Sequence, residues 1–255
     1  MGVVLEASEI VKNYEISNGF YILEVFSPDI ARSSAPGQFI MINLSHLHND
    51  PLLPRAYSMA RRTTETLVFI YRVVGRGTGL LSEKRPGDRV HVWGPLGNGF
   101  TITDRKAVLI GGGTGAAPLI DLSEEMSRRG MDHTLVCGGR TAGDLKFMDE
   151  FSDVVKYSAY TEDGSLGEKG FVTDYISNGN VGAAAAIYSC GPMGMLRRVS
   201  ELAAEKGAEC QISIETPMAC GLGTCLGCAV PKRNSKGYYK ACTDGPVFDS
   251  KEVVI

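Results

Sequence analysis

Apolar and polar residues alternate in short runs over the first 104 residues, and the runs are rich in β-branched and aromatic side chains. This period-2 pattern is typical of strands in a half-buried sheet. Turn residues separate the runs, for example Pro36-Gly37 and Pro86-Gly87-Asp88. The predicted strands are Phe20–Ser27, Gln38–Leu44, Arg55–Ala60, Thr66–Val74 and Arg89–Pro95. Several short strands at this spacing predict a small antiparallel β-barrel, with one short helix over Thr78–Lys84.

From residue 105 the pattern changes to buried strands that alternate with amphipathic segments. Strands are expected at Ala107–Gly111, His133–Gly139, Val154–Tyr160 and Ala183–Gly191. Helices are expected at Gly115–Arg129 and Gly194–Gly207, and another is expected to start at Gly170 in GFVTDYISN. This alternation predicts a parallel sheet with helices on both faces, as in nucleotide-binding α/β domains.

Beyond residue 211 the helical periodicity stops and a cysteine-rich segment begins. We therefore expect three domains: a β-barrel over 1–104, a nucleotide-binding α/β domain over 105–210, and a small domain over 211–255. The predicted fold class is β plus α/β with a small C-terminal domain.

Composition narrows the class of protein. Hydrophobic residues make up 44% of the 255 residues, enough for full cores, which argues against disorder. The net charge of −3 and the absence of a Lys/Arg block argue against nucleic acid as a partner. No apolar run approaches the roughly 20 residues of a membrane span, and the N-terminal residues do not resemble a signal peptide. Seven cysteines without an export signal indicate a cytoplasmic location.

Four of these cysteines, Cys220, Cys225, Cys228 and Cys242, have the spacing C-x4-C-x2-C-x13-C. The first three match the plant-type spacing for a [2Fe-2S] cluster, with a fourth cysteine further along the chain. Glycines between them let the backbone curl and direct N–H groups toward the sulfurs. The spacing predicts a [2Fe-2S] cluster and single-electron transfer.

Two other interpretations of the cysteines fit less well. A structural zinc site usually shows two C-x2-C pairs or a mixture of cysteine and histidine. This segment has one C-x2-C pair and no histidine. Disulfides are unexpected because nothing in the sequence suggests export.

A glycine loop follows the first strand of the α/β domain, with the sequence GGGTGAAP from Gly111 to Pro118. Such a loop brings backbone N–H groups and a helix N-terminus close to a phosphate. The candidate dinucleotide residues are Gly111, Gly113, Thr114 and Gly115. The next strand ends in Gly138-Gly139-Arg140 without the usual acidic residue, so the choice between NAD and NADP stays open.

Three further motifs are ambiguous by themselves. Arg55-Ala56-Tyr57-Ser58 could serve a flavin through phosphate pairing, ring stacking and a hydrogen bond, or it could be an ordinary strand. Gly75–Gly79 could be a second phosphate-binding turn or an ordinary glycine turn. Cys190-Gly191 ends a predicted sheet strand, where ligands bind in such folds, but a buried cysteine before a turn would look the same.

In combination, the motifs R-x-Y-S, G-R-G-T, GGGTGAAP and C-G-P-M occur in the order found in the ferredoxin–NADP reductase superfamily, which this chain resembles. The terminal MACGLGTCLGCAV…YYKACTDGPVF is similar to the electron-transfer subunits of NAD-linked dihydroorotate dehydrogenases. The resemblance covers essentially the whole chain.

The resemblance implies a set of cofactors and residues. The barrel would bind FAD, and NAD would enter the α/β domain as electron acceptor, with Glu162-Asp163-Gly164 at its rim. The cofactor-binding residues it implies are Arg55, Ala56, Tyr57, Ser58, Ile70, Tyr71, Arg72, Gly77 and Thr78 for FAD, and Gly111, Gly113, Thr114, Gly115, Cys190 and Gly191 for NAD. The metal ligands are the four cysteines.

The resemblance also implies a partner. In the family, an FMN-containing catalytic subunit oxidises dihydroorotate for pyrimidine biosynthesis, and two copies of each subunit form a heterotetramer. Electrons would pass from that subunit through the cluster and FAD to NAD⁺, so no residue catalytic toward dihydroorotate is expected here.

Two alternatives remain at this point. The chain could be a related subunit that connects NAD(P)H with a ferredoxin or a sulfur-reducing partner. Many such relatives carry aspartate in place of the first cluster cysteine, so Cys220 favours the dihydroorotate branch. A zinc-stabilised nucleotide sensor is the non-enzymatic alternative; it would be colourless, whereas a flavin and iron protein is brown.

Overall fold

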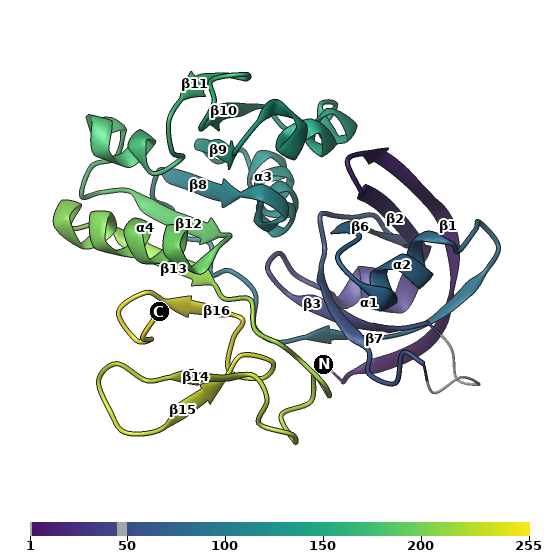
Figure 1. Cartoon of the computed structure of the whole chain (residues 1–255). Helices are drawn as coiled ribbons and strands as arrows, with labels where there is room; N and C mark the ends of the chain where they lie inside the picture. Colours follow the sequence, from purple (N-terminus) through teal and green to yellow (C-terminus); the bar gives the residue numbers. More distant parts are fainter. Residues whose placement is uncertain (1, 45–49) are drawn as a thin grey trace.

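The computed structural model describes residues 2–44 and 50–255. Within these residues the chain forms an antiparallel β-barrel, a parallel sheet flanked by helices, and a C-terminal segment with a small hairpin (Figure 1). This order confirms the fold class predicted from the sequence.

In the described part of the chain, the barrel sheet has the strand order β4-β3-β7-β1-β2-β6-β5, and every neighbouring pair is antiparallel. Its strands are β1 (Val4–Ser17), β2 (Phe20–Phe26), β3 (Phe39–Asn43), β4 (Arg55–Ser58), β5 (Arg61–Arg62), β6 (Thr66–Arg72) and β7 (Arg89–Leu96). Two short helices, α1 (Pro28–Ser33) and α2 (Arg76–Ser82), belong to the same unit. The helix α2 therefore begins two residues before its predicted start.

The long strand β1 was not expected from the sequence. It pairs with both β2 and β7, yet the positions it buries include Ser8 and Asn13. Asn13 is satisfied inside the barrel because its side chain donates to the Leu81 carbonyl oxygen at 2.8 Å and accepts from the Tyr71 hydroxyl at 2.9 Å. Polar residues in core positions remove the hydrophobic alternation by which a strand is recognised.

The second sheet has the order β11-β10-β9-β8-β12-β13-β16, and all its pairs are parallel except β13 with β16. Its strands are β8 (Ala107–Gly112), β9 (His133–Gly139), β10 (Tyr157–Thr161), β11 (Glu168–Lys169), β12 (Ala186–Cys190), β13 (Glu209–Ser213) and β16 (Val247–Asp249). The helical segments are η1 (Gly113–Ala116), α3 (Ala117–Arg128), η2 (Ala142–Phe151), η3 (Ile176–Asn180) and α4 (Met193–Lys206).

Three details differ from the sequence expectation. The helix expected to start at Gly170 begins only at Asp174 and continues as the five-residue π-helical η3, which Gly179 interrupts with a φ of 86°. A glycine in this left-handed conformation ends a helix. The third strand of the sheet starts at Tyr157 rather than Val154. The sheet also continues through β13, so the predicted boundary between residues 210 and 211 falls inside a strand of this sheet.

The C-terminal segment contains the hairpin of β14 (Ala229–Pro231) and β15 (Tyr238–Lys240) and then returns to the sheet as β16. It also packs on the barrel: the Asn98 side chain donates to the Asp244 carbonyl oxygen at 3.0 Å. A Cβ at Gly221 would lie 2.7 Å from Cγ of Met41 on β3. The cysteine-bearing loops are thereby fixed against both larger units.

Candidate functional site

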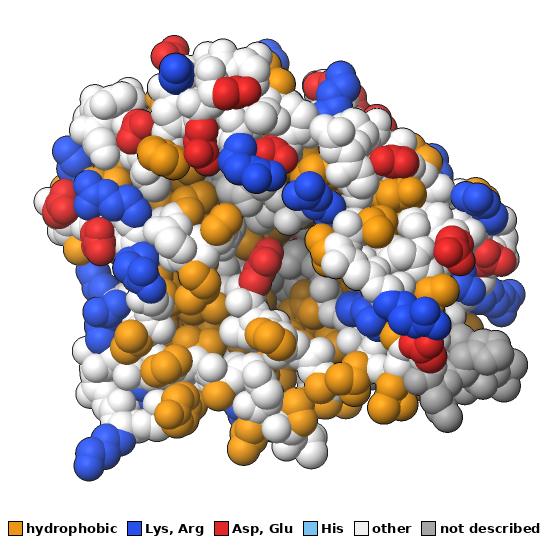
Figure 2. Space-filling model, in the orientation of Figure 1, with side chains coloured by type: hydrophobic (Ala, Val, Ile, Leu, Met, Phe, Trp, Pro, Cys, Tyr) orange, Lys and Arg blue, Asp and Glu red, His pale blue; other side chains and the backbone are white. Residues whose placement is uncertain are grey.

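A cavity of about 730 Å³ lies where the carboxyl ends of the parallel strands meet the barrel. Phe20 and Arg72 form its barrel side, and the loops after β8, β9, β10 and β12 form the other side. The space-filling view shows this face of the molecule hollowed between the two units (Figure 2). Ligands of open α/β sheets bind at this strand edge.

The predicted glycine loop reaches the cavity with Gly113, Thr114 and Gly115. Gly111 does not line the cavity: it is buried in β8, and a Cβ there would lie 2.9 Å from the Ala116 Cα. The loop therefore presents its later residues, and their backbone N–H groups, to a ligand.

Gly115 also contacts the end of β12. A Cβ at Gly115 would lie 2.5 Å from the Gly191 Cα and 2.7 Å from the Cys190 carbonyl oxygen. Gly191 lines the cavity, whereas Cys190 is 1% exposed and burial raises the pKa of its thiol. Of the two predicted residues, only Gly191 has direct access to a ligand.

Charged residues of both signs line the same cavity. Arg140, at the end of β9, lies with its Nε 3.5 Å from Oδ2 of Asp144, and Asp144 also accepts from the Arg140 backbone N–H at 3.1 Å. Glu162 and Arg198 add a carboxylate and a guanidinium, while Asp163 and Gly164 lie outside the lining. Asp144 escaped the sequence analysis because a ribose-binding acid is usually sought at the strand end itself, and Asp144 lies five residues beyond the end of β9.

Glu215 is a cavity-lining residue that the sequence analysis missed. It follows β13, just before the first cluster cysteine, and burial raises the pKa of its carboxyl. The neighbouring Thr216 hydroxyl is buried without a hydrogen-bond partner. Nothing in the local sequence marks Glu215, since only the return of the chain from β13 to the barrel brings it to the cavity.

On the barrel, the Arg55 guanidinium lies against Gly77, where a Cβ would collide with it. Thr78 fixes the turn before α2, because its hydroxyl oxygen accepts from the backbone N–H groups of Val74 at 3.0 Å and Gly75 at 3.2 Å. A guanidinium held over a glycine turn is a suitable cradle for a pyrophosphate. These residues therefore fit a dinucleotide-type flavin.

The other predicted flavin residues divide between surface and core. Tyr57 is 9% exposed and packs edge-on against Phe69 and Tyr71; burial raises its pKa to about 12. Ile70 and Tyr71 are buried, whereas Ala56 and Ser58 are half-buried. Arg72 lines the cavity with its guanidinium 5.1 Å from the Phe20 ring centroid.

The four predicted metal ligands come together in the C-terminal segment as two pairs. The thiol of Cys225 contacts the sulfur of Cys220, and the Cys228 and Cys242 sulfurs lie 3.2 Å apart. Cys225 is exposed, whereas Cys228 and Cys242 are buried. Over residues 2–44 and 50–255, no three Cys, His, Asp or Glu side chains surround a single point as ligands of one metal ion. Two sulfur pairs suit a cluster of two irons in which each iron takes two of the four thiolates.

Backbone N–H groups point at these sulfurs. Leu222 N–H donates to Cys220 at 3.3 Å, and Gly223 N–H donates to Cys242 at 3.2 Å. Hydrogen bonds from backbone N–H groups lower the pKa of Cys220 to about 6, and the bond from Leu222 has the largest effect. Burial, followed by the nearby Cys228 thiol, raises the pKa of Cys242 to about 12. The loop adopts this shape with Gly221 and Gly223 at φ of 70° and 79°. The donor set therefore fits an iron–sulfur cluster.

In the residues that the structure describes, no helix is long and apolar enough to cross a membrane.

Comparison with known proteins defines the class of protein. Residues 109–201 match the oxidoreductase NAD-binding domain. A solved structure described as an NADH-dependent reduced ferredoxin-NADP oxidoreductase superposes with a TM-score of 0.86 at 30% identity, over 98% of this chain and 90% of that one. A ferredoxin NADP⁺ reductase from Neisseria gonorrhoeae with bound FAD and NADP shares the fold at a TM-score of 0.67 and 15% identity, over 80% and 92% of the two chains. The chain is thus an oxidoreductase with the flavin- and NAD-binding reductase fold and an iron–sulfur domain.

The C-terminal segment specifies the family. Residues 215–254 match the iron–sulfur cluster binding domain of dihydroorotate dehydrogenase B. The chain is 38% identical to the dihydroorotate dehydrogenase B (NAD(+)) electron transfer subunit of Geobacillus sp. (strain WCH70), over 98% of both chains. It is 36% identical to the homologue from Aquifex aeolicus (strain VF5), over 97% of this chain and 98% of that one. The chain belongs to the family of dihydroorotate dehydrogenase B electron transfer subunits.

Proposed function

We propose that this chain binds FAD in its barrel and a [2Fe-2S] cluster on Cys220, Cys225, Cys228 and Cys242. With these cofactors it would pass electrons from an FMN-containing dihydroorotate dehydrogenase subunit to NAD⁺. The observation that carries the proposal is the combination of paired cysteine sulfurs, under backbone N–H donors, with a nucleotide cavity shared by barrel and sheet. A flavin, when bound, accepts single electrons and exchanges a hydride, and so it connects a cluster with nicotinamide.

Each group of residues has a defined task in this proposal. The Arg55 guanidinium over Gly77 holds the flavin pyrophosphate. The backbone of Gly113–Gly115 receives the dinucleotide phosphates, and Gly191 leaves room beside them. The N–H groups of Leu222 and Gly223 hold negative charge on the cluster sulfurs, which tunes the reduction potential. The working parts are residues 1–104, 105–210 and 211–255.

Complex formation tests the proposal directly. We infer a heterotetramer of two electron-transfer and two catalytic subunits. Co-expression of the two chains should yield this complex, and NADH should form from dihydroorotate and NAD⁺ only when both chains are present. A different co-purifying partner, with no dihydroorotate-dependent reduction of NAD⁺, would contradict the proposal.

A second function is favoured by one observation, the 0.86 TM-score with the NADH-dependent reduced ferredoxin-NADP oxidoreductase. On this alternative the partner would be a ferredoxin or a sulfur-reducing protein, with the same cofactors in the chain. The co-purification experiment separates the two functions, because only the first gives dihydroorotate-dependent NADH.

Arg55→Ala should lower the flavin content of the purified chain, because the variant loses the guanidinium that lies against the Gly77 turn. A charge-assisted contact of this kind contributes about 1.5–3 kcal/mol, so FAD should dissociate about 10- to 100-fold more readily. Flavin absorbance after dialysis measures the loss. Arg89→Ala, on an exposed position of β7, is the control and should retain flavin. Equal flavin content in both variants would remove Arg55 from the site.

Glu215→Gln should change the pH dependence of stability. Burial raises the pKa of the Glu215 carboxyl, so the folded chain favours the protonated carboxyl more than the unfolded chain does. The free energy of unfolding of the unaltered chain therefore falls as pH rises above the ordinary glutamate pKa near 4.5. Glutamine removes this loss, so the variant should gain Tm relative to the unaltered chain more at pH 8 than at pH 5. Parallel melting temperatures across this range would show that Glu215 does not titrate in the cavity.

A further inference from the structure

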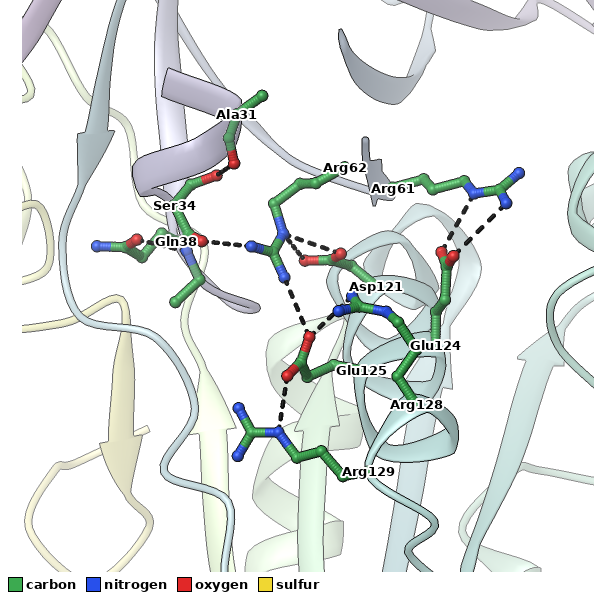
Figure 3. A network of polar contacts seen from close by, with 11 residues as sticks. Ala31, Ser34, Gln38, Arg61, Arg62, Asp121, Glu124, Glu125, Arg128 and Arg129 are labelled. Atoms are coloured by element: carbon green, nitrogen blue, oxygen red, sulfur yellow. Dashed lines mark hydrogen bonds and ion pairs between the residues drawn. The ribbon is translucent and has the colours of Figure 1, made fainter. Parts of the chain in front are cut away.

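A buried ion pair joins the barrel to the parallel sheet unit. Arg62 on β5 has a side chain 11% exposed, and Asp121 on α3 has one 1% exposed. The Arg62 Nε lies 3.0 Å from Oδ1 and 2.7 Å from Oδ2 of Asp121. The same guanidinium donates through Nη1 to the backbone oxygen of Ser34 after α1 (Figure 3). Arg62 is thus held from both units at once.

A third contact restricts the guanidinium further. Its Nη2 lies 4.0 Å from Oε2 of Glu125, one turn after Asp121 on α3. Glu125 is itself held by Arg128 at 2.8 Å and Arg129 at 2.7 Å (Figure 3). The contacts leave the Arg62 guanidinium a single orientation relative to α3.

Buried ion pairs add little net stability, because desolvation offsets the attraction between the charges. Burial raises the pKa of the Asp121 carboxyl, and the Arg62 guanidinium beside it opposes this shift. What a planar guanidinium adds is direction: Nε faces both oxygens of Asp121 while Nη1 donates to Ser34, so one rigid group fixes α3 relative to the end of α1. The effect of this pair therefore lies in the position of α3 relative to the barrel rather than in net stability.

The pair connects the two sides of the cavity. Asp121 is one turn into α3, which directly follows the Gly113–Ala116 loop at the cavity. On the barrel, Arg62 pairs with Leu67 at the start of β6, and the other end of that strand carries the cavity-lining Arg72. A shift of α3 relative to β5 would move the glycine loop relative to the barrel.

We propose that Arg62 and Asp121 are positioning residues that fix the glycine loop at the distance from the barrel that hydride transfer between nicotinamide and flavin requires. The inference rests on the proposed function. In the direction of the proposed function, a hydride with its electron pair would leave the reduced flavin, which becomes oxidised, and join C4 of NAD⁺, which becomes NADH; reduction of the flavin by NADH is the reverse of the same transfer. Such transfers depend steeply on geometry: a misplacement of about 1 Å costs about 100-fold in rate.

The test measures reduction of the flavin by NADH in the full-length, cofactor-loaded chain by anaerobic stopped flow. Arg62→Lys keeps the charge but cannot contact Asp121 and Ser34 with one rigid group, so its limiting rate should fall about tenfold or more. The isotope effect with NADH deuterated at C4 should rise, because hydride transfer becomes more rate-limiting. The NADH concentration for half-maximal rate should change by less than about threefold, since the groups that contact the dinucleotide are intact.

A second readout needs no cofactor. In the unloaded chain, amide hydrogen exchange at residues 113–121 should be faster in Arg62→Lys, and exchange in β9 should be unchanged. The matched control is Arg32→Lys on α1: the Arg32 side chain is 56% exposed and pairs with Asp29 of the same helix at 2.6 Å, so it joins no two units. This control should keep the rate, the isotope effect and the exchange of the unaltered chain.

The double variant Arg62→Met/Asp121→Leu removes the directional contact while keeping the site apolar and filled. In other proteins, apolar replacement of a buried ion pair often preserves stability. It should melt cooperatively and reduce flavin at least as slowly as Arg62→Lys; if it does not fold, Arg62→Lys decides alone. Unaltered rate, isotope effect and exchange in the folded variants would overturn the inference. Failure of NADH to reduce the flavin in the unaltered chain would overturn the proposed function itself.

Discussion

Cys225→Ser should abolish the iron–sulfur absorbance and leave the flavin in place. Cys225 is the exposed cysteine of the set, so serine there should not disturb the folded chain, but it removes one of the four thiolates that the cluster needs. In the complex with the catalytic subunit, dihydroorotate-dependent reduction of NAD⁺ should fall to background. Reduction of the flavin by NADH should continue, because the cavity and the barrel are unaltered. Visible and electron paramagnetic resonance spectra, with iron and flavin content, measure the result.

The control for this prediction is Cys210→Ser. Cys210 is buried on β13, and burial raises the pKa of its thiol to about 12, so it is an inert structural thiol. This variant should retain iron, sulfide and flavin. Cluster absorbance that survives in Cys225→Ser would contradict the ligand assignment, and loss of cluster and flavin together would mean that the substitution unfolds the segment.

Gly115→Ala should disable the dinucleotide site. The added Cβ would lie 2.5 Å from the Gly191 Cα and 2.7 Å from the Cys190 carbonyl oxygen, and both are backbone atoms that cannot rotate away. The glycine loop must therefore shift from the end of β12. A displacement near 1 Å should lower the rate of flavin reduction by NADH about 100-fold, and calorimetry should show weaker binding of NAD⁺.

Gly182→Ala makes the same chemical change where no heavy atom lies within 4 Å, and it should behave like the unaltered chain. Both variants should retain flavin and cluster, since neither touches those residues. Unchanged NAD⁺ affinity and flavin reduction in Gly115→Ala would place the dinucleotide elsewhere than at the Gly113–Gly115 loop.

The family and its iron–sulfur domain were predictable from local sequence because the motifs that mark them are defined by the spacing of residues close together in the chain. The four cysteines and the glycines between them bring backbone N–H groups to the sulfurs, whereas contacts with Met41 and Asn98 hold the loops against the larger units. Strand β9 coincides with its prediction because its centre, residues 135–138, is buried and forms an uninterrupted apolar run. The helix expected to start at Gly170 begins later, at Asp174, and stays short because Gly179 interrupts its second turn.

The sequence by itself determined the order of barrel, α/β sheet and cysteine segment, through periodicity and motif spacing. Only the tertiary structure decided which residues of a motif reach the cavity: Gly113 and Gly191 do, whereas Gly111 and Cys190 lie behind them. It also brought Glu215 to the cavity and Arg62 to Asp121, 59 residues apart in the chain. Such partners leave no local signature, because the packing of separate units selects them rather than any neighbour in sequence.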